Sequence, residues 1–482
     1  MKILFAASEA APFVKTGGLG DVASALPAAL AAAGHEVSVF LPLYGQIKSG
    51  PFFKKMKKIA EFETPLSWRR QYTGVYRLAK KAGSPSCYFL DNEYYFKRDG
   101  RGIYGEYDDG ERFVFFSRAI LETVRRTGMN PDLIHCNDWQ TAALPVFKNV
   151  FYPDLGRTGT LFTIHNIEYQ GKMPQGFAGD VMGLDGDAAK FVEYGGCVNL
   201  MKGAAVCAGA VSTVSRRYAG EILNSYYGQG LEGVLAERAN RGELYGIVNG
   251  IDTALYDPAT DRAIAANYSA ADLSGKEINK RELRKKLGLR DDPDIPLCGM
   301  VTRLASHKGI DLVERVIEET ANAGVQFAIL GTGEARFEEF FIRLSARRPD
   351  MISATIGFSG SLASEIYAGS DIFLMPSKSE PCGLSQLVAM RYGAVPVVRE
   401  TGGLADTVPA YNPQTREGRG FTFVSYNAHD MKDAIMRCAS FYRTDRAGFD
   451  ELRKSDMLAD FSWNAATGEY LRIYNKLISR DA

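Results

Sequence analysis

Short hydrophobic runs alternate with helix-length stretches along almost the whole chain. The hydrophobic runs have the length of strands, and they lie at residues 2–8, 36–41, 133–136, 160–165, 210–215, 244–248, 297–302, 326–330, 353–358, 371–376, 394–398 and 421–424. Helical patterns lie between many of them, at residues 20–33, 111–126, 309–321, 334–346 and 383–392. Strands that are hydrophobic throughout, with helices between them, are typical of parallel sheets covered on both faces. The pattern therefore predicts an α/β protein with doubly wound parallel sheets.

A polar stretch at residues 252–294 interrupts this alternation near the middle of the chain. Because 482 residues suffice for two or three domains, we expect two doubly wound domains, at residues 1–250 and 251–460. Residues 461–482 are predicted to form a C-terminal helix that packs on either domain and can cross back to the first. The aromatic-rich residues 50–110 are less regular, and we expect an insertion of strands and loops there.

Charge and composition narrow the class of protein. The 57 Lys and Arg residues balance 57 Asp and Glu residues, which disfavours nucleic acid and membranes as partners, because both attract a basic surface. No hydrophobic run reaches the ~18 residues of a membrane span. The hydrophobic run at the N-terminus is interrupted by Glu9 and Lys15, so we interpret it as a buried strand rather than a signal peptide. The seven cysteines include no C-x-x-C pair, which favours reduced thiols and a cytoplasmic protein.

The hexapeptide T-G-G-L-[GA]-D occurs twice, within KTGGLGDV at residues 15–22 and within ETGGLADT at residues 400–407. Chance is one interpretation, because the chain is rich in Gly, Leu and Ala. Each copy, however, follows a predicted strand and precedes a helical stretch, where glycine allows close approach and free N–H groups attract phosphate. Ligands bind beyond the carboxyl ends of the strands in such sheets. We therefore predict that each domain contributes one turn to a shared site in a cleft.

Other polar residues follow predicted strands at the same end of the sheets. Arg303 and Lys308 come just after a strand and are cations suited to a diphosphate. Glu380 lies in a loop before a helical stretch, and His165 ends a strand. Each residue alone has a simple structural explanation, as a solvated cation, a carboxylate near a helix N-terminus or a core histidine. Their common position favours one functional site.

The segment ILGTGEARF at residues 329–337 supplies a glycine turn after another strand, with Gly331 and Gly333. Arg336 stands where a dinucleotide-binding fingerprint has its third glycine. No acidic residue ends the next strand. An NAD-dependent oxidoreductase is therefore the weaker alternative.

The motifs occur in a fixed order along the chain, as KTGGLGDV, HCNDWQT (135–141), TIHN (163–166), VNGID (248–252), TRLASHKG (302–309), SKSEPCGLSQL (377–387) and ETGGLADTV. Together they resemble bacterial glycogen synthase and plant starch synthase, from residue 3 to the C-terminal helix. K-T-G-G-L together with E-P-C-G-L points to the ADP-glucose branch. The resemblance implies the GT-B fold, in which two Rossmann-like domains face each other across a deep cleft, the first on the acceptor side and the second binding the nucleotide sugar.

The resemblance also implies the reaction and its partners. Glucose would pass from ADP-glucose to the non-reducing end of an α-1,4-glucan such as glycogen, with retention of the anomeric configuration and release of ADP. The same-face transfer that it suggests, in which the diphosphate accepts the proton of the acceptor, does not follow from residue spacing. The oligomeric state is not predicted.

Five residues match the catalytic positions of that family. Lys15 matches the lysine at the donor phosphates, and Arg303 with Lys308 matches the pair that neutralises the leaving diphosphate. Glu380 matches the acidic residue at the donor glucose, and His165 matches the histidine that contacts this sugar. Further donor-binding residues are implied by the same motifs, and these are Gly17, Gly18, Asp21, Asp138, Asn249, Gly331, Gly333, Cys382, Gly383, Leu384, Thr401, Gly402, Gly403 and Leu404.

Two positions in HCNDWQT, Asn137 and Gln140, are histidine in some members of the family, so neither is given a catalytic role. The acceptor side is less defined. Tyr94, Tyr95 and Trp139 could contact glucan rings, and packing in the core is the equal alternative for such aromatic side chains.

No metal and no cofactor are expected. No D-x-D motif ends a strand, and Asp108 and Asp109 lie in a polar aromatic loop. Arg303, Lys308 and Lys15 would instead stabilise the charge that grows on the leaving diphosphate. Only Glu380 stands out among the carboxylates, so no protein nucleophile for a double displacement is identified.

Two other interpretations are possible. One is an enzyme of the same fold that uses UDP-glucose or a different acceptor, because the residues that contact the base of the donor cannot be identified from the sequence. The other is a glucan-binding protein that has lost catalysis, which the intact Lys15, His165, Arg303, Lys308 and Glu380 argue against.

Overall fold

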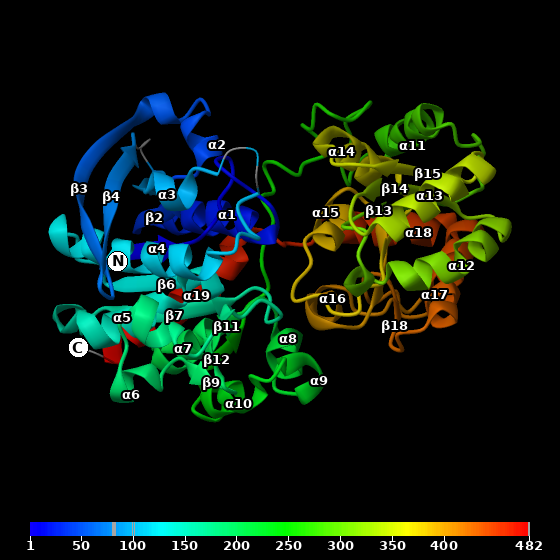
Figure 1. Ribbon diagram of the computed structural model, residues 1–482. Coiled ribbons are helices and arrows are strands. Elements are labelled where there is room, and N and C mark those ends of the chain that lie inside the picture. The colour runs from blue at the N-terminus through cyan, green and yellow to red at the C-terminus, as the bar shows by residue number, and fades with distance from the viewer. Residues whose placement is uncertain (80–82, 99, 101, 481–482) are drawn as a thin grey trace. The chain divides into compact units, whose positions relative to one another are not determined.

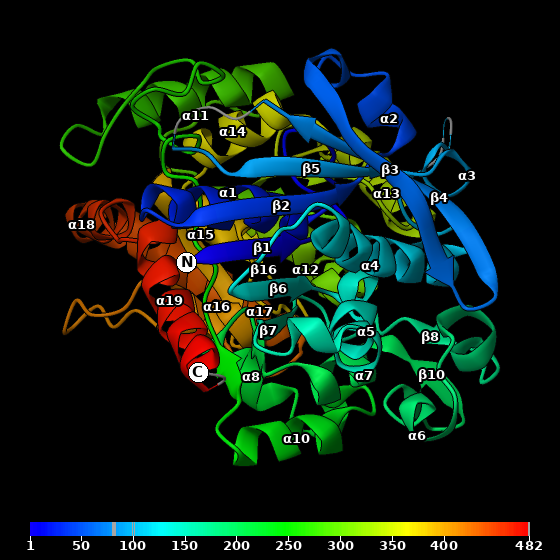
Figure 2. The ribbon, with the colours of Figure 1, turned by 90° about the vertical axis from the view of Figure 1, so that its left-hand side faces the viewer.

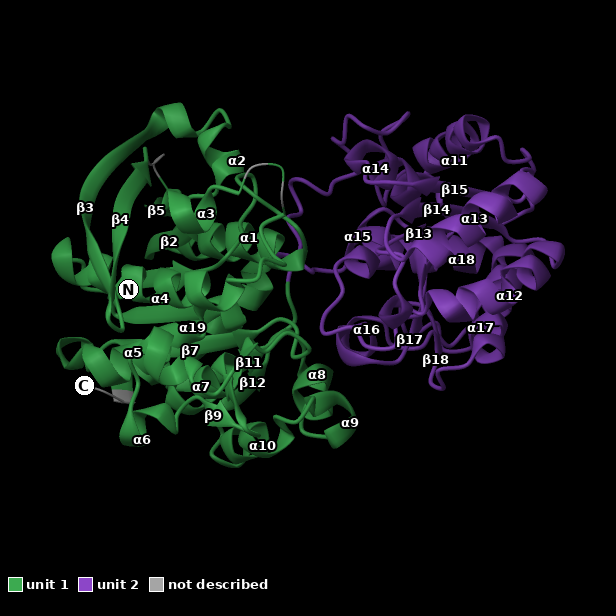
Figure 3. Ribbon diagram, in the orientation of Figure 1, with its two compact units in different colours: residues 1–249, 463–482 green, residues 250–462 purple. Residues whose placement is uncertain are grey.

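The computed structural model describes residues 1–79, 83–98, 100 and 102–480. The chain divides into two compact units (Figures 1 and 3). Unit 1 comprises residues 1–249 and 463–482, and unit 2 comprises residues 250–462. The C-terminal helix therefore belongs to unit 1, although the rest of that unit lies at the start of the chain. The acceptor and donor roles expected for the two domains remain predictions.

Unit 1 is built on one nine-stranded sheet with the strand order β12-β11-β7-β6-β1-β2-β5-β4-β3. All pairs are parallel except β3–β4 and β4–β5. The strands are β1 (Lys2–Ala6), β2 (Glu36–Pro42), β3 (Met56–Leu66), β4 (Arg69–Leu78), β5 (Ser86–Asp91), β6 (Leu133–Asn137), β7 (Gly159–Ile164), β11 (Ala210–Thr213) and β12 (Leu244–Gly246). The six strands predicted before residue 250 are thus present, and β3 to β5 are the strands of the aromatic-rich insertion.

The helices of unit 1 connect these strands. They are α1 (Gly18–Ala32), α2 (Gly45–Lys48), α3 (Glu93–Phe96), α4 (Asp109–Arg126), α5 (Ala143–Phe151), α6 (Gly186–Ala189), α7 (Leu200–Cys207), α8 (Arg216–Glu221), α9 (Ser225–Gly228), α10 (Glu232–Asn240) and α19 (Trp463–Arg480). A small second sheet contains β8 (Lys172–Met173), β10 (Cys197–Asn199) and β9 (Glu193–Tyr194).

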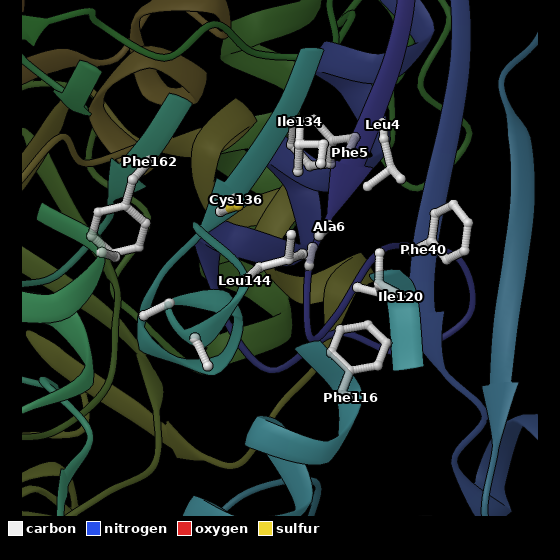
Figure 4. Close-up of a cluster of buried hydrophobic side chains, with 14 of the residues drawn as sticks. Leu4, Phe5, Ala6, Phe40, Phe116, Ile120, Ile134, Cys136, Leu144 and Phe162 are labelled. Carbon is white, nitrogen blue, oxygen red and sulfur yellow. The ribbon is translucent and has the colours of Figure 1, made fainter. Parts of the chain in front are cut away.

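Both faces of the unit 1 sheet are covered, as the continuous hydrophobic strands predict. Helices α4 and α5 pack together, and α1 packs beside α19 (Figure 2). Figure 4 shows Leu4, Phe5 and Ala6 of β1 with Ile134 and Cys136 of β6 in the core. Neighbouring side chains in this close-up come from β2, β7, α4 and α5, and these are Phe40, Phe162, Phe116, Ile120 and Leu144.

Unit 2 contains one six-stranded parallel sheet with the order β15-β14-β13-β16-β17-β18. Its strands are β13 (Leu297–Val301), β14 (Gln326–Gly331), β15 (Ile352–Ile356), β16 (Ile372–Met375), β17 (Val395–Arg399) and β18 (Phe421–Phe423). Its helices are α11 (Ser274–Leu287), α12 (Ile310–Asn322), α13 (Ala335–Arg347), α14 (Gly360–Gly369), α15 (Ser385–Arg391), α16 (Gly402–Thr407), α17 (Ala428–Thr444) and α18 (Arg446–Met457). All six predicted strands after residue 294 are present.

Alternate residues of the unit 2 strands enter different hydrophobic clusters. Phe327 and Ile329 of β14 pack with α12, α13 and α17, whereas Ala328 and Leu330 pack with α11 and α14. A side-chain period of two residues places neighbours on opposite faces of a strand. The sheet is therefore buried on both sides by helices, which is the doubly wound arrangement expected from the sequence.

The strand orders of the two sheets define where each has its topological switch point. In unit 2, β14 and β15 lie on one side of β13, and β16, β17 and β18 lie on the other. In unit 1, β2 and β5 lie on one side of β1, and β6, β7 and β11 lie on the other. Ligands of such sheets bind beyond the carboxyl ends of the two strands where the order reverses. Those strands are β13 and β16 in unit 2, and β1 and β6 in unit 1.

A search of the described residues for a helix that is long and apolar enough to span a membrane finds none.

Candidate functional site

The predicted catalytic residues of unit 2 lie at its switch point. Arg303 and Lys308 follow β13, and Glu380 follows β16, which is the neighbour of β13 in the sheet. The side chain of Arg303 is exposed, and its guanidinium has no ion pair or hydrogen bond with any residue that the structure describes. An uncompensated guanidinium at this edge is suited to an anionic ligand.

Lys308 and Glu380 form a close ion pair. Lys308 Nζ donates to Glu380 Oε2 at 2.6 Å, and Ser377 Oγ donates to the same oxygen at 2.9 Å. The Glu380 side chain is 8% exposed and that of Lys308 is 18% exposed, so the pair is largely withdrawn from water. Such charge-assisted hydrogen bonds fix the position of both groups. We call Arg303, Lys308 and Glu380 the unit 2 site.

The second copy of the repeated hexapeptide supports the Glu380 loop. Residues 401–404 are buried, and α16 begins directly after Thr401. The Gly403 N–H donates to the carbonyl oxygens of Glu380 at 3.1 Å and Pro381 at 3.2 Å. A Cβ on Gly402, which has φ = +46°, would overlap the Glu380 carbonyl oxygen. Glycine is needed at position 402 because the backbone there packs directly against the backbone of the Glu380 loop. The contact of residues 402–404 with a donor remains a prediction.

The turn with Gly331 and Gly333 packs against the loop that carries Arg303. A Cβ on Gly331 or Gly333 would overlap a carbonyl oxygen of Thr302 or Leu304, respectively. The Gly333 N–H donates a hydrogen bond to Glu338 Oε1 at 2.7 Å. This backbone donor is therefore paired with a carboxylate of α13. The two glycines therefore position the β13 loop.

Three other residues predicted for the donor lie beside Glu380. Cys382 is buried, and its carbonyl accepts from Gln386 Nε2 at 3.0 Å. Gly383 follows it with φ = +74°, and Leu384 is the N-cap of α15. These residues connect the Glu380 loop to α15, and any contact with a donor remains a prediction.

The first copy of the hexapeptide is arranged differently from the second. Lys15, Thr16, Gly17 and Gly18 are exposed, and α1 begins at Gly18. Lys15 Nζ donates to Asp21 Oδ1 at 2.7 Å. The two copies thus share a strand–turn–helix position, but only the first presents its glycines to solvent.

Glu9 is a residue of this turn that the sequence analysis did not identify. Its carboxylate is buried, and Oε2 accepts from the Thr16 N–H at 2.5 Å and from Thr16 Oγ1 at 2.8 Å. Burial raises the pKa of Glu9, while hydrogen bonds from Thr16, Gly20 and Gly17 oppose that shift. The turn therefore has a buried carboxyl group near the N-terminus of α1, where a carboxylate is favourable. An acidic residue within an otherwise hydrophobic N-terminal segment was the available signal.

His165 follows β7 and lies next to Asn137 and Asp138 at the end of β6, which is one of the two switch-point strands of unit 1. Its backbone N–H donates to Asp138 Oδ1 at 2.7 Å, and its ring Nε2 lies 2.9 Å from Asn137 Oδ1. Burial lowers the pKa of His165 to about 3, so the imidazole is neutral at physiological pH. We call Lys15, His165 and Asp138 the unit 1 site.

Asp138 combines an unusual backbone with a perturbed carboxyl group. Its φ of +56° lies in a region that non-glycine residues rarely adopt, and such residues are concentrated at functional sites. Burial raises the pKa of Asp138 to about 7, against hydrogen bonds from the backbone N–H groups of His165 and Asn166 that lower it, and Glu9 adds a small increase. The carboxyl group thus titrates near neutrality.

Asn249 was predicted to support the donor site. It is buried, and its Oδ1 has no hydrogen-bond partner among the described residues. A buried polar atom without a partner is costly, so a ligand or water that donates to this oxygen would relieve that cost.

The predicted acceptor aromatics differ in exposure. Tyr94 is 61% exposed, whereas Tyr95 is fully buried and its hydroxyl donates to Glu111 Oε1 at 2.6 Å. The ring of Tyr95 is therefore not accessible to a glucan. Tyr95 is a core residue, which is the alternative that the sequence analysis gives for it. Trp139 is partly buried and packs edge-on against Phe113 with ring centroids 5.3 Å apart.

Phe358 is a second feature that the sequence analysis missed. The hydrophobic pattern predicts that it ends a strand at 353–358, but β15 ends at Ile356 and the Phe358 ring is 94% exposed. The backbone N–H of Gly357 donates to Gly331 O at 3.0 Å, so Phe358 follows the glycine turn beside the Arg303 loop. An exposed aromatic ring at a ligand-binding edge is suited to stacking on a base.

Among the residues that the structure describes, no three His, Cys, Asp or Glu side chains gather in a way that could hold a metal ion. Metal independence stays a prediction that rests on the cations of the two sites.

Replacing Asp138 with asparagine should stabilise unit 1 above pH 7. The folded pKa of Asp138 is raised to about 7 from an ordinary value of 3.8, so its favourable contribution is complete below the unfolded pKa and is lost as the pH rises through 7. Asparagine keeps an acceptor for the His165 N–H but carries no charge. Because one pKa unit is worth about 1.4 kcal/mol, we expect a gain of at least about 1 kcal/mol at pH 8.

Denaturant unfolding of both proteins from pH 4 to pH 8 tests this expectation. The gain should shrink steadily below pH 7 and approach zero near pH 4. An equal difference at every pH would mean that Asp138 has an ordinary pKa in the folded protein.

Comparisons with known proteins identify the family of this chain. The family model of the starch synthase catalytic domain matches residues 2–237, and that of glycosyl transferases group 1 matches residues 279–443. Proteins named glycogen synthase are similar over essentially the whole chain. That of Exiguobacterium sibiricum is 48% identical over 100% of both chains, and that of Geobacillus thermodenitrificans is 47% identical over 100% of this chain and 99% of its own.

Solved structures show the same relationship. The catalytic domain of starch synthase IV from Arabidopsis thaliana, bound to ADP and acarbose, matches with a TM-score of 0.89 and 33% identity over 99% of each chain. Sucrose-phosphate synthase from Thermosynechococcus elongatus matches with a TM-score of 0.62 and 17% identity over 99% of each chain, which shows a common fold. The two parallel-sheet units are those of the GT-B glycosyltransferase fold, as the sequence predicts.

Proposed function

Because the chain belongs to the glycogen synthase family of glycosyltransferases, we propose that its donor is ADP-glucose and its acceptor is the non-reducing end of an α-1,4-glucan. Membership of the family shows that the chain is a glucan-synthesising glycosyltransferase. The identity of the donor as ADP-glucose is what we propose in addition. A starch synthase catalytic domain that binds ADP and acarbose is 33% identical to this chain, which supports a nucleoside diphosphate and a saccharide as partners here. The seven cysteines are free thiols, which fits our proposal of a cytoplasmic enzyme.

The observation that carries this proposal is the group of charges at the unit 2 switch point. Arg303 is exposed and lies in the same loop after β13 as Lys308, which pairs with Glu380. When the bond between glucose and the diphosphate breaks, negative charge grows on the leaving group and positive charge grows on the sugar. The cations favour the first change, and the Glu380 carboxylate favours the second.

The unit 1 site would serve the same reaction with Lys15 and His165. Lys15 would bring a further cation to the diphosphate, and a neutral His165 would accept a hydrogen bond from the sugar. We propose that these cations replace a metal ion. We also propose that the transfer occurs on one face of the sugar with retention, as membership of this family implies.

Glucosyl transfer into glycogen in the presence of EDTA tests the donor and the absence of a metal together. With ADP-glucose, we expect kcat/KM to be unchanged by EDTA and at least about tenfold higher than with UDP-glucose. An exclusive use of UDP-glucose would contradict the donor, and a loss of activity in EDTA that Mg²⁺ restores would contradict the cation-only site. No incorporation from either donor would favour a glucan-binding protein without catalysis. Protein with Glu380→Ala, purified in parallel, controls for contaminating enzymes.

A further inference from the structure

The side chain of Asn137 is held in one orientation by its own hydrogen bonds. Asn137 ends β6, is fully buried, and lies opposite Thr163 of β7. Its Nδ2 donates to the carbonyl oxygen of Ala6 at 3.0 Å. A carbonyl oxygen only accepts hydrogen bonds, so the NH₂ group must face Ala6 and the amide oxygen must face away from it.

The backbone of Asn137 is fixed as well. Its N–H donates to Thr141 Oγ1 at 2.6 Å, and Thr141 Oγ1 donates to the Asn137 carbonyl oxygen at 2.9 Å. The residue is therefore anchored through its backbone and its amide nitrogen. Neither group can turn without breaking a buried hydrogen bond, which costs about 1–3 kcal/mol when a partner is left unpaired.

The fixed amide oxygen determines where the proton of His165 lies. Asn137 Oδ1 is 2.9 Å from His165 Nε2 and has no proton to donate, so Nε2 must carry the hydrogen. The other nitrogen, Nδ1, then has a lone pair. Nδ1 forms no hydrogen bond to any residue that the structure describes, and His165 is partly exposed.

We propose that Asn137 is a positioning residue that keeps His165 as the neutral Nε2–H tautomer, so that Nδ1 accepts a hydrogen bond from a hydroxyl of the bound sugar. The role given to the sugar rests on the proposed function, whereas the tautomer rests on the geometry alone. A sugar offers O–H donors at every carbon, and a neutral imidazole nitrogen accepts from one of them without adding a charge beside the cation that forms during transfer. Burial lowers the pKa of His165 to about 3, which also favours the neutral form of the ring.

The tautomer can be measured without any activity. The chain has only five histidines, so ¹⁵N-histidine labelling gives few side-chain signals, and the His165 signal is the one lost in His165→Gln. At pH 7 we expect one protonated and one unprotonated nitrogen, with the proton on Nε2. An Nδ1–H tautomer or a doubly protonated ring would overturn the proposal.

Asn137→Asp tests the consequence for the reaction. The carboxylate has nearly the same shape and still accepts from Nε2–H, but it loses the hydrogen bond to the Ala6 carbonyl oxygen, and its charge favours the imidazolium ion, in which Nδ1 is a donor. A carboxylate beside the ring raises the pKa of His165 by about 1–3 units, from about 3 to at most about 6. At pH 5 we therefore expect a doubly protonated His165 signal that the wild type lacks and about tenfold lower kcat/KM, with recovery as the pH rises and the ring loses its proton. A merely structural role would lower activity equally at every pH.

The outcomes of the two measurements separate the two proposals. A doubly protonated ring with unchanged kcat/KM in Asn137→Asp would overturn the acceptor role of Nδ1. If Asn137→Asp does not fold, the tautomer of the wild-type protein still decides the assignment. A wild-type protein with the Nε2–H tautomer that transfers no glucose would contradict the proposed function, while the tautomer assignment would stand.

Discussion

Replacing Lys308 with alanine should lower kcat for glucosyl transfer by about 10²–10³-fold, which is the usual cost of removing one group that stabilises charge in a transition state. Lys308 Nζ lies 2.6 Å from Glu380 Oε2 at the switch point of unit 2. Without this cation, the diphosphate loses a partner as its charge grows. We also expect weaker binding of ADP, because ADP carries the same charge in the ground state.

The same substitution disturbs Glu380, and this effect has to be separated from the first. In Lys308→Ala, the Glu380 carboxylate keeps, among the described residues, only the hydrogen bond from Ser377 Oγ at 2.9 Å. Glu380→Ala should therefore be measured beside it. We expect a comparable loss of kcat in Glu380→Ala, but ADP binding that is largely kept, because this change removes no cation from the phosphates.

Steady-state kinetics and ADP titration by calorimetry distinguish these expectations. Lys432→Ala is a matched control, since it removes a lysine of unit 2 that pairs with Glu319 on the surface at 2.8 Å, and its kinetics should match the wild type. A kcat of Lys308→Ala within about threefold of the wild type would contradict a role at the leaving group. Unchanged turnover in Glu380→Ala would exclude that residue from the mechanism.

Twelve strands of the two sheets could be predicted because a buried parallel strand is hydrophobic on both faces, whereas β3 to β5 were expected only as part of an insertion. The run at 326–330, for example, becomes β14 (Gln326–Gly331), whose alternate residues enter two separate clusters. The position of the site followed from the same pattern, since Arg303, Lys308, Glu380 and His165 each come just after a strand. Their side-chain geometry could not be predicted, because it depends on which strands are neighbours.

The residues that escaped prediction depend on contacts and burial that the sequence pattern does not show. Glu9 has its partner Thr16 in the turn before α1, and only the fold shows that its carboxylate is buried there. The repeated hexapeptide looks the same in both copies, yet only the second is buried against a neighbouring loop. Tyr95 illustrates the reverse problem, because an aromatic residue type alone does not separate a core position from a surface for sugar.

The charged segment between the domains gives a further example. The sequence pattern indicates a polar interruption at residues 252–294, and this segment contains the helix α11 (Ser274–Leu287). Three cations of this helix, Lys276, Lys280 and Arg284, are nevertheless buried. Charged residues are rarely buried unless they have partners, so their burial could only be recognised once those partners were located in the fold.

Replacing Asp371 with asparagine should lower the free energy of unfolding of unit 2 by about 3–5 kcal/mol, the usual cost of breaking a buried ion pair. Asp371 precedes β16 and accepts from Lys280 Nζ at 2.7 Å, from the Leu297 N–H at 2.8 Å, and from Arg453 Nη2. The three ionic side chains are at most 2% exposed. The carboxylate joins α11 and α18 to the sheet, and asparagine would leave two buried cations without their counter-charge.

The pH dependence of stability follows from the same contacts. Burial alone would raise the pKa of Asp371, but Lys280 and Arg453 outweigh it and lower the pKa below its ordinary value of 3.8. A carboxyl group with a lowered folded pKa stabilises the protein above the unfolded pKa, and this contribution is lost as the pH falls toward the folded pKa. Below about pH 4, the wild type should therefore lose stability more steeply than Asp371→Asn.

Denaturant unfolding at pH 7 and pH 3 would test both statements. Glu339→Gln is the control within unit 2, because its pair with Arg343 is exposed and should contribute less than about 1 kcal/mol. Lys280→Met and the double variant complete a cycle in which the double loss should be smaller than the sum of the single losses, because both changes break one pair. Additive losses would mean that Lys280 and Asp371 stabilise unit 2 independently, and an effect of Asp371→Asn as small as that of Glu339→Gln would contradict the role of the buried carboxylate.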